Sequence, residues 1–311
     1  MPSSPTATML VWMMSRIRFI HEIYLEGINM KKTVAVLLTV FNRKNVTIKG
    51  LETLFSAMKP VEDKYSFDVY MTNDGCTDGT PESVKQLYPH VNVIDGEGGL
   101  YWSGGMRKAW VNAAKNKEYD YYLWFNDDAD LYNDALLEMF AKTEGAGEKI
   151  IVAGLFCDKR GLVSYGAYDK CFNLIGPNCD SKPFLLNGNL VLISKAVVDK
   201  IGIINEYYIH SGGDWDYGCR ALEAGIIILT TDKFVGITDR HDADLAPFID
   251  KSKPLSKRFK LLHSIKCDVR RTFHFNYEHI SKIYAFKVIL FQYAYAIFPK
   301  LYFLTHKKVV L

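Results

Sequence analysis

The sequence predicts an α/β domain built on a mainly parallel sheet. From residue 33 onward, short apolar runs alternate with stretches of helical pattern, and the run YYLWF at residues 121–125 is continuously apolar. Alternation at this spacing is typical of βαβ units with right-handed crossovers. A continuous apolar run is typical of a strand buried on both faces of such a sheet.

The positions of the individual elements follow from the same pattern. The expected strands are residues 34–39, 67–72, 91–94, 121–125 and 150–155. The expected helices are residues 46–58, 81–88, 104–115 and 134–142. Residues 184–193 suit a strand pair or a bulged strand. Residues 214–224 suit a helix that is closed by Gly225 and followed by a strand at 226–230.

Composition and charge narrow the class of protein. In the 311 residues, 49% are hydrophobic and 23% are charged, as in a globular protein with a core. From Lys251 onward there are 13 basic and 2 acidic residues, a net charge of +11, which leaves the preceding residues at −8. A basic tail on an acidic body suggests contact with an anionic surface. The 6 cysteines form no CxxC pair, which argues against a zinc ribbon and favours reduced thiols in the cytosol.

The two ends of the chain differ from its body. Residues 1–29 lack the order of a signal peptide, because their basic residues follow the apolar run, so we expect a disordered or non-native extension before Met30. The main domain is expected over residues 30–250, and a basic, aromatic, helical extension over 251–311. The apolar run at 288–298 is shorter than the roughly 20 residues of a spanning helix. Two interpretations of this run remain, a helix that lies in the membrane interface and a helix that packs on the body of the protein.

Three carboxylates follow the most apolar run, in NDDAD at residues 126–130. In open α/β sheets the C-terminal ends of the strands border the ligand crevice. Carboxylates this close together repel one another unless a cation or hydrogen-bond donors hold them. Asp128 and Asp130 therefore suit a divalent metal that carries a phosphate. The alternative is a solvated turn in which Asp134 caps the next helix.

A second polar motif, NDGCTDGT at residues 73–80, also follows an expected strand. Asp74, at the end of that strand, could accept hydrogen bonds from a nucleobase or a ribose. The alternative is a tight turn in which Asp78 or Thr80 caps the following helix. The two interpretations are compatible, since different side chains carry them.

Taken together, the motifs resemble those of the family 2 glycosyltransferases, inverting enzymes with a nucleotide-binding domain of the GT-A type. The matching segments are TVFNR at 39–43, the turn at 73–80, DAD at 128–130 as the DxD motif, and GGDWD at 212–216 with Arg220. The resemblance covers about residues 31–242. It implies a single Rossmann-like GT-A domain with a mixed, mainly parallel central sheet, followed by a C-terminal helical extension.

The resemblance also implies a role for each motif. The donor nucleotide would be bound by Thr39, Phe41, Asn42, Arg43, Asp74 and Asp128. Asp130 would hold Mg²⁺ or Mn²⁺, because hard cations prefer oxygen ligands and a metal neutralises the departing diphosphate. His241 would complete the metal site, although a single histidine can equally be structural. Asp214 would be the general base, ionised at neutral pH, and could also cap the helix that follows it.

Three further residues are candidates for contact with the sugar or the acceptor, namely Trp102, Trp215 and Asp216. Aromatic rings stack on the C–H faces of sugars, and burial in the core is the alternative for both tryptophans. The family usually has a Glu-Asp pair at the catalytic acid. Here Gly213 precedes Asp214, so one carboxylate contact to the acceptor is expected to be absent.

The function implied is that of a metal-dependent hexosyltransferase. It would move a sugar from a nucleotide-sugar donor to a glycan or a lipid-diphosphate-linked acceptor in surface polysaccharide biosynthesis. The overall pattern is most similar to bacterial rhamnosyl- or galactofuranosyl-type enzymes. The expected location is the cytoplasm, peripheral at the inner face of the cell membrane, where the basic tail would meet anionic lipid. A homodimer is one possible oligomeric state, and no nucleic acid is expected as a partner.

Two other classes of protein compete with this interpretation. A sugar-phosphate nucleotidyltransferase would show a glycine-rich, basic loop after the first strand, and TVFNR lacks those glycines. A catalytically inactive protein of the same fold, binding only carbohydrate or nucleotide, is favoured by the missing Glu before Asp214. Four retained carboxylates argue against it, namely Asp74, Asp128, Asp130 and Asp214.

Overall fold

A mixed β-sheet organises the part of the chain that the computed structural model describes, which is residues 16, 30–240, 246–265 and 267–305. Its strands are β1 (Lys32–Val40), β2 (Tyr65–Asn73), β3 (Asn92–Asp95), β4 (Tyr121–Phe125), β5 (Asp130–Leu131), β6 (Ile150–Cys157), β7 (Val163–Tyr165), β10 (Leu190–Ser194) and β11 (Ile227–Ile237). They lie in the order β3-β2-β1-β4-β10-β6-β11-β5, and β7 pairs with β6. A separate small sheet pairs β8 (Ala167–Tyr168) with β9 (Leu185–Leu186).

The pairing is mainly parallel, as predicted. β1 pairs in parallel with β2 and with β4, β2 pairs in parallel with β3, and β6 pairs in parallel with β11. β10 is antiparallel to both of its neighbours, β4 and β6, and β11 is antiparallel to β5. The segment 184–193 does form two strands. They belong to different sheets, however, because β9 pairs with β8 while β10 enters the main sheet.

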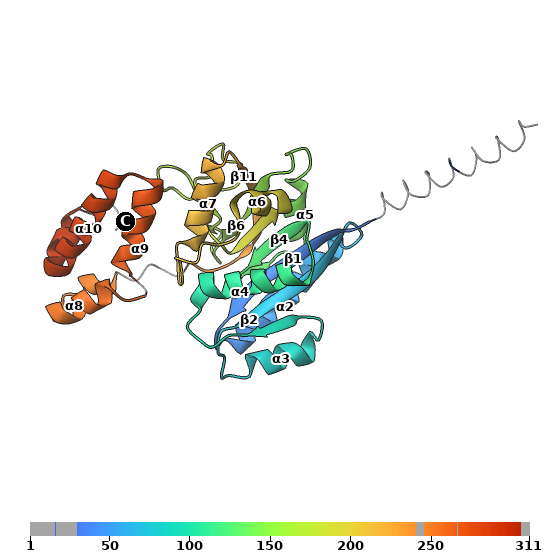
Figure 1. Cartoon of the computed structure of the whole chain (residues 1–311), viewed down its shortest axis with the longest axis horizontal. Coiled ribbons are helices and arrows are strands. Elements are labelled where there is room, and N and C mark those ends of the chain that lie inside the picture. The colour runs from blue at the N-terminus through green and yellow to red at the C-terminus, as the bar shows by residue number, and fades with distance from the viewer. Residues whose placement is uncertain (1–15, 17–29, 241–245, 266, 306–311) are drawn as a thin grey trace, which may run out of the picture.

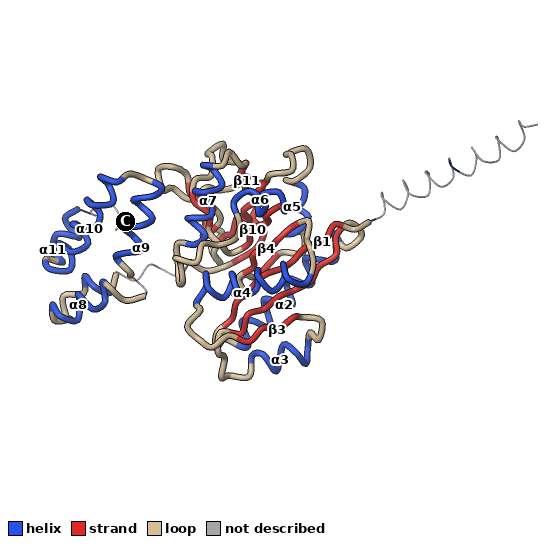
Figure 2. The backbone as a smooth tube through the Cα atoms, in the orientation of Figure 1, coloured by secondary structure: helices blue, strands red, loops and turns tan. Residues whose placement is uncertain are grey.

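Helices cover both faces of the sheet (Figures 1 and 2). They are α2 (Lys44–Met58), α3 (Thr80–Leu87), α4 (Tyr101–Asn116), α5 (Ala135–Ala141), α6 (Lys195–Ile201) and α7 (Gly213–Glu223), with the 3₁₀ turn η1 (Lys59–Val61) after α2. Side chains alternate between the faces of a strand, and β1 shows the consequence. Val36 and Leu38 pack in one core cluster with Leu51 of α2, whereas Leu37 packs in the other with Trp110 of α4. Burial on both faces is why β1 and β4 are continuously apolar.

The start of α4 is pressed against the C-terminal end of β1. Thr72 Oγ1 donates a hydrogen bond of 2.8 Å to the carbonyl oxygen of Gly105. A Cβ atom on Gly105 would lie only 2.1 Å from Thr39 Oγ1, so no larger residue fits on this backbone. This close approach fixes the loop before α4 beside the ends of β1 and β2.

The remaining described helices gather at one end of the molecule, at the left in Figure 1. They are η2 (Pro247–Ile249), α8 (Leu255–Leu262), α9 (Val269–His279), α10 (Lys282–Ile297) and α11 (Pro299–Thr305). Phe248, Leu262 and Ala296 help to form their own small core. Within the described residues, none of the helices combines the length and apolar character needed to cross a bilayer. The predicted boundary at residue 250 falls between η2 and α8, whereas the predicted extension 1–29, Arg16 apart, lies outside the described residues.

Candidate active site

The parallel pairing brings three of the predicted motifs to one edge of the sheet. Val40 at the end of β1 is in register with Asn73 at the end of β2, and Leu37 is in register with Trp124 of β4. The segments that follow these strands therefore start side by side. They are the loops that contain Arg43, Asp74 and the acidic residues 126–130.

A cavity of about 360 Å³ lies at this edge. It is lined by five of the predicted residues, Thr39, Phe41, Arg43, Asp74 and Trp102, together with Val40, Gly99, Tyr101 and His210. Tyr101 and His210 have ring centroids 5.1 Å apart and were not predicted. The glycine-rich loop around Tyr101 could have indicated that Tyr101 lies at a ligand site. Nothing in the local sequence indicates this for His210.

Asp74 and Asn42 shape this cavity through the backbone. The Asp74 carboxylate accepts hydrogen bonds from the backbone N–H groups of Leu100 (2.9 Å) and Tyr101 (2.8 Å), so it holds the start of α4. Asn42 has a φ of +49° and its side-chain oxygen accepts from the N–H of Thr77 at 2.7 Å. Asn42 thus ties the first loop to the second and is not among the residues that line the cavity.

Basic and hydroxyl side chains hold the acidic cluster after β4. Asp127 is fully buried, accepts a hydrogen bond of 2.5 Å from Thr47 Oγ1 and forms an ion pair with Arg43. Arg43 Nη1 also lies 3.0 Å from Asp128 Oδ2, and Lys49 pairs with Asp130. Burial raises the pKa of Asp127 to about 6, although the positive charge of Arg43 opposes the shift. The repulsion expected among these carboxylates is therefore relieved by neighbouring donors.

The pair predicted to bind metal borders a second cavity, of about 310 Å³. The side chains of Asp128 and Asp130 are 21% and 40% exposed, so both can reach a ligand. Among the described residues, no group of three or more His, Cys, Asp or Glu side chains is arranged to hold a metal ion, and His241 lies outside them. Magnesium is often held by one or two carboxylates and completed by substrate phosphates. The residues present fit a cation of that kind, provided Lys49 moves aside.

The sequence also suggested that Asp78 or Thr80 caps α3 and that Asp134 caps α5, and the structure treats the two helices differently. The N-cap residue of α3 is Gly79, so neither Asp78 nor Thr80 takes that position. Asp78 Oδ1 nevertheless accepts a hydrogen bond of 3.1 Å from the N–H of Thr80, the first residue of the helix. Asp134 stands at the N-cap position of α5, where the described structure gives its side chain no capping hydrogen bond.

Asp214 lies in the first turn of α7. The helix starts after Gly212, whose φ of +88° favours glycine, so Gly212 and not Asp214 is the N-cap residue. The Asp214 carboxylate accepts from the N–H groups of Gly188 (3.1 Å) and Trp215 (3.0 Å). Burial raises its pKa to about 6 against these two hydrogen bonds, so the group is mostly ionised at pH 7. It lines a third cavity, of about 410 Å³, together with Trp215.

Gly213 stands where the resemblance leads one to expect a Glu, and the packing explains why no side chain is present. A Cβ atom on Gly213 would lie 2.7 Å from Ser103 Oγ and 3.0 Å from Ile204 Cγ2. A larger residue would push α7 away from α4. The close contact between α7 and α4 therefore requires a glycine at this position and excludes the carboxylate.

The turn formed by Asn187, Gly188 and Asn189 connects the separate motifs. Asn189 accepts a backbone hydrogen bond of 2.9 Å from Asn126, which precedes the acidic cluster, and Gly188 donates to Asp214. Trp102 Nε1 donates to Asn126 Oδ1 at 2.6 Å, and a Cβ on Gly188 would lie 2.2 Å from the Trp102 ring. Sequence reasoning missed this turn, although its NGN sequence between two strands is a turn signal.

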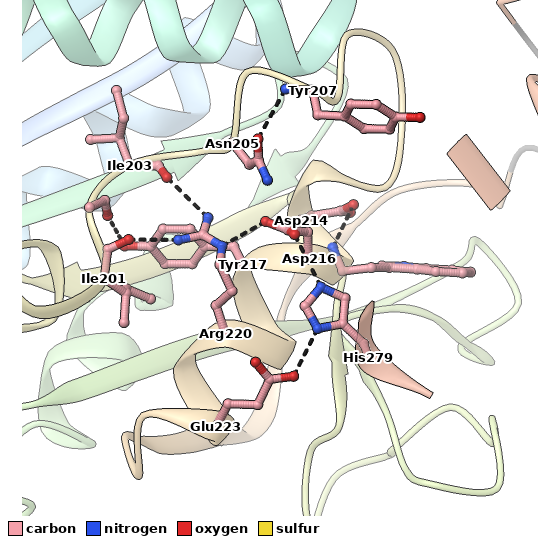
Figure 3. A network of polar contacts seen from close by, with 12 residues as sticks. Ile201, Ile203, Asn205, Tyr207, Asp214, Asp216, Tyr217, Arg220, Glu223 and His279 are labelled. Atoms are coloured by element: carbon pink, nitrogen blue, oxygen red, sulfur yellow. Dashed lines mark hydrogen bonds and ion pairs between the residues drawn. The ribbon is translucent and has the colours of Figure 1, made fainter. Parts of the chain in front are cut away.

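Asp216 belongs to a buried ion-pair network, shown in Figure 3. Its carboxylate accepts from Arg220 Nε at 2.7 Å and lies 3.1 Å from His279 Nε2, and His279 Nδ1 lies 2.8 Å from Glu223. Asp216 is only 2% exposed and is not among the residues that line the cavity beside Asp214. In place of the predicted acceptor contact, Asp216 ties α7 to α9. Sequence reasoning missed His279 because the two residues are 63 positions apart.

The comparisons with known proteins agree with this architecture. Residues 35–189 match the family model described as glycosyl transferase family 2, so the chain carries a glycosyl transferase family 2 domain. No curated protein matches the sequence.

Among solved structures, the mannosyltransferase PcManGT from Pyrobaculum calidifontis, in complex with GDP-Man and Mn²⁺, has 15% identity and a TM-score of 0.52, covering 86% of this chain and 70% of that one. GalNAc-T7 with UDP, GalNAc and Mn²⁺ has 15% identity and a TM-score of 0.52, covering 86% and 57%. S. aureus TarS has 16% identity and a TM-score of 0.51, covering 85% and 43%. At these identities the similarity shows the GT-A fold, and this chain spans less than two thirds of the last two proteins.

Proposed function

We propose that this protein is a metal-dependent, inverting glycosyltransferase that uses a nucleotide-sugar donor. One observation carries the proposal: the loop bearing Asp128 and Asp130 and the carboxylate of Asp214 are both hydrogen-bonded to the turn at residues 187–189. A diphosphate site and a general base would then flank one ligand space. Two of the similar structures, solved with GDP-mannose or UDP and Mn²⁺, support the choice of donor and metal.

The cavities suit a donor and an acceptor that meet. His210 lines the cavity beside Asp74, and the next residue, Ser211, lines the cavity beside Asp214, so consecutive residues border the two spaces. We assign the donor nucleotide to the cavity beside Asp74, which Thr39, Phe41 and Arg43 line and whose loops Asn42 fixes. Asp128, which pairs with Arg43, borders the neighbouring acidic cavity and would reach the donor from there. We assign the acceptor to the cavity beside Asp214, where Trp215 offers a ring for stacking, and the sugar of the donor to the side of Trp102 in the cavity beside Asp74.

In the reaction, Asp214 takes the proton of an acceptor hydroxyl while that oxygen attacks the anomeric carbon of the donor sugar. The bond from this carbon to the diphosphate oxygen breaks, its electron pair leaves with the diphosphate, and the configuration inverts. Arg43, which lines the cavity beside Asp74, and Lys49, which lines the cavity beside Asp130, are the cations that would interact with the leaving oxyanion. Mg²⁺ or Mn²⁺ would supply Lewis-acid neutralisation of the diphosphate, with Asp130 and, on the sequence resemblance, His241 as its ligands.

The finer assignments rest on the sequence resemblance and the charge of the tail. They are a hexosyltransferase of rhamnosyl or galactofuranosyl type, a glycan or lipid-diphosphate-linked acceptor in surface polysaccharide biosynthesis, and peripheral attachment at the inner membrane face. A homodimer is compatible with this assignment. An inactive protein of the same fold is the alternative, because Gly213 leaves no room for the second carboxylate.

The direct test is release of nucleoside diphosphate from a panel of UDP-, GDP- and dTDP-sugars, with Mg²⁺, with Mn²⁺ and with chelator. Asp130→Ala and Asp214→Asn should each lose more than about 100-fold in rate, the scale of a lost metal ligand or general base. Asp199→Asn is the matched control, because Asp199 pairs with Lys195 on the exposed surface of α6. Turnover that persists in both site variants would contradict the proposal. Metal-dependent nucleotide binding without any turnover would favour the inactive alternative.

A further inference from the structure

We infer that the acceptor carries a negatively charged oxyanion group, a phosphate ester or a carboxylate, beside the reacting hydroxyl, and that Arg271 and Tyr208 recognise it. The inference rests on the proposed function and deepens it by naming the class of acceptor. It starts from the cavity beside Asp214 and from side chains that the sequence motifs do not include.

One wall of this cavity comes from the C-terminal helices. Arg271, Thr272, Phe275 and Asn276 of α9 line it together with Asp214 and Trp215 of α7. The wall is held in place by His279, at the end of α9, through its contacts with Asp216 and Glu223 of α7 (Figure 3). The extension after residue 250 therefore completes the space in which a molecule next to Asp214 would bind.

Arg271 brings a positive charge to that wall. Among the described residues that line the cavity, Asp214 and Arg271 are the charged ones. Arg271 Nη1 donates a hydrogen bond of 3.1 Å to the carbonyl oxygen of Ile265, which orients the guanidinium. Burial lowers the pKa of Arg271, yet an arginine stays protonated in proteins at neutral pH. A half-buried, oriented guanidinium matches the two oxygens of a carboxylate or a phosphate with parallel hydrogen bonds.

Tyr208 is the second, independent sign of a ligand. Its side chain is fully buried, it lines the same cavity, and its hydroxyl oxygen has no hydrogen-bond partner within the described part of the chain. Buried hydroxyl groups are nearly always paired, so this one suits a partner that arrives with the ligand. Burial also raises the pKa of Tyr208, which keeps the group a donor.

The two side chains converge on the same point of the backbone. A Cβ atom on Gly212 would lie 3.2 Å from the Tyr208 ring and 3.8 Å from Cδ of Arg271. Gly212 directly precedes the helix that carries Asp214, so donor groups and general base border one space. A neutral hydroxyl could satisfy Tyr208 alone, whereas an oxyanion can accept from both residues. The net charge of +11 after residue 250 also favours the approach of an anionic molecule.

The test uses three acceptors that share one sugar. They are its neutral alkyl glycoside, the alkyl glycoside of the corresponding uronic acid, and the alkyl diphosphate ester of the sugar. The readout is the ratio of kcat/KM for each charged acceptor to that for the neutral one. The wild type should prefer one charged acceptor, and which one it prefers identifies the source of the oxyanion. Arg271→Gln should lower that ratio about 10- to 100-fold, mainly through KM, because a charge-assisted pair is lost.

Two further variants separate recognition from folding. Arg271→Lys keeps the positive charge but loses the planar guanidinium that can donate two parallel hydrogen bonds, so its kcat/KM ratio should lie between those of the wild type and Arg271→Gln. Tyr208→Phe should lower the ratio several-fold relative to the wild type. Arg270→Gln is the matched control, since Arg270 is the neighbouring residue, is exposed, pairs with Asp268 and does not line the cavity. Its ratio should equal that of the wild type.

A wild type without preference, or equal ratios in Arg271→Gln and Arg270→Gln, would overturn the inference. If the donor is hydrolysed but none of the three acceptors is used, calorimetric titration with inorganic pyrophosphate and with glucuronate decides. Binding lost in Arg271→Gln and kept in Arg270→Gln supports the subsite, and equal binding by both variants refutes it. Failure of the proposed function is distinguishable, because donor turnover would then be absent while the titration still reports on Arg271.

Discussion

Two carboxylates, buried Asp127 and partly buried Asp214, dominate the site at the scale of single residues. Burial raises the pKa values of Asp127 and Asp214 to about 6, from an ordinary value of 3.8. Each group therefore binds its proton more tightly in the folded chain than in the unfolded chain. The resulting stabilisation is full below pH 3.8 and is lost as the pH rises through about 6. At neutral pH both charges are kept at a cost in stability, which is typical of functional sites.

Asp214→Asn is expected to stabilise the protein while it abolishes transfer. The amide oxygen can still accept from the N–H groups of Gly188 and Trp215, and the desolvated charge is gone. The free energy of unfolding at pH 7 should rise by up to about 2 kcal/mol. At pH 4, where the wild-type carboxyl is mostly protonated, the difference should nearly vanish. Urea unfolding at both pH values measures it, and a variant less stable than the wild type at pH 7 would contradict the assignment.

Arg43→Gln is expected to destabilise the chain in a pH-dependent way. The substitution removes the cation that faces buried Asp127 and its neighbour Asp128. At pH 8 the loss should be about 1–3 kcal/mol, because a buried charge is left without its partner. At pH 5 the loss should be smaller, since Asp127 then takes up a proton. Lys195→Gln, which breaks an exposed pair, should cost less than about 0.5 kcal/mol. A loss for Arg43→Gln that is equal at pH 5 and pH 8 would rule out this explanation.

At the scale of elements, the contact between α7 and α9 decides whether the cavity beside Asp214 has its second wall. Burial alone would lower the pKa of His279, but the bonds to Asp216 and Glu223 outweigh it and the net shift is upward. Burial alone would raise the pKa of Asp216, but His279 and Arg220 outweigh it and the net shift is downward. The stabilisation from Asp216 is present above pH 3.8. That from His279 is full below pH 6.5 and is lost as the pH rises through its folded pKa.

His279→Gln should therefore flatten the pH dependence of stability. At pH 6 the variant should lose about 1–3 kcal/mol, as expected for a buried, charge-assisted pair, and at pH 9 it should lose less. Hydrogen exchange should show faster opening of α9 at pH 6, when exchange rates are corrected for pH. His90→Gln, which changes an exposed histidine after α3, should match the wild type at both pH values. A loss for His279→Gln that grows toward pH 9 would refute the charged contact.

At the scale of the whole molecule, charge and exposed apolar surface gather at the same end. The segment from residue 251 carries a net charge of +11 against −8 for the rest of the chain. Helix α10 buries Ala285 and Ala296, α11 buries Pro299, and the segment 282–305 leaves other apolar side chains exposed. The most exposed of these are Ile283, Phe286, Leu290, Phe298 and Leu304. Apolar side chains among lysines are the kind of surface that binds an anionic bilayer, and peripheral attachment stays a prediction.

Binding to vesicles tests that attachment. The protein should cosediment with vesicles that contain phosphatidylglycerol more strongly than with neutral vesicles, and added salt should weaken the binding. Phe286→Glu with Leu290→Glu should lower the partition coefficient at least about 10-fold, because two apolar contacts are lost and two negative charges are added. Leu87→Glu, at an exposed position on α3, is the control. Equal partition of all three proteins would argue against the membrane surface.

Much of the fold could be read from local pattern. Apolar periodicity located β1, β2, β4 and β6 and the helices between them to within a few residues, because burial on both faces leaves a continuous apolar run. Parallel pairing then places the loops after β1, β2 and β4 at one edge, so Thr39, Asp74 and Asp128 could be expected to lie close together. These features depend on residues near one another in the chain, which is why the sequence by itself determined them.

Tertiary structure alone decided which distant groups meet. A local pattern records that a residue is buried but not which partner it meets, so β10 could not be placed antiparallel between β4 and β6 from its sequence. Asp216 looks like a site residue beside Asp214, yet His279 and Arg220 draw it into an ion-pair network. Arg271 and Tyr208 carry no motif: Arg271 reaches the cavity because α9 packs on α7, and Tyr208 reaches it from the loop before α7. The local sequence determined the motifs and most helices and strands, whereas packing between distant segments determined which residues form the acceptor side of the site.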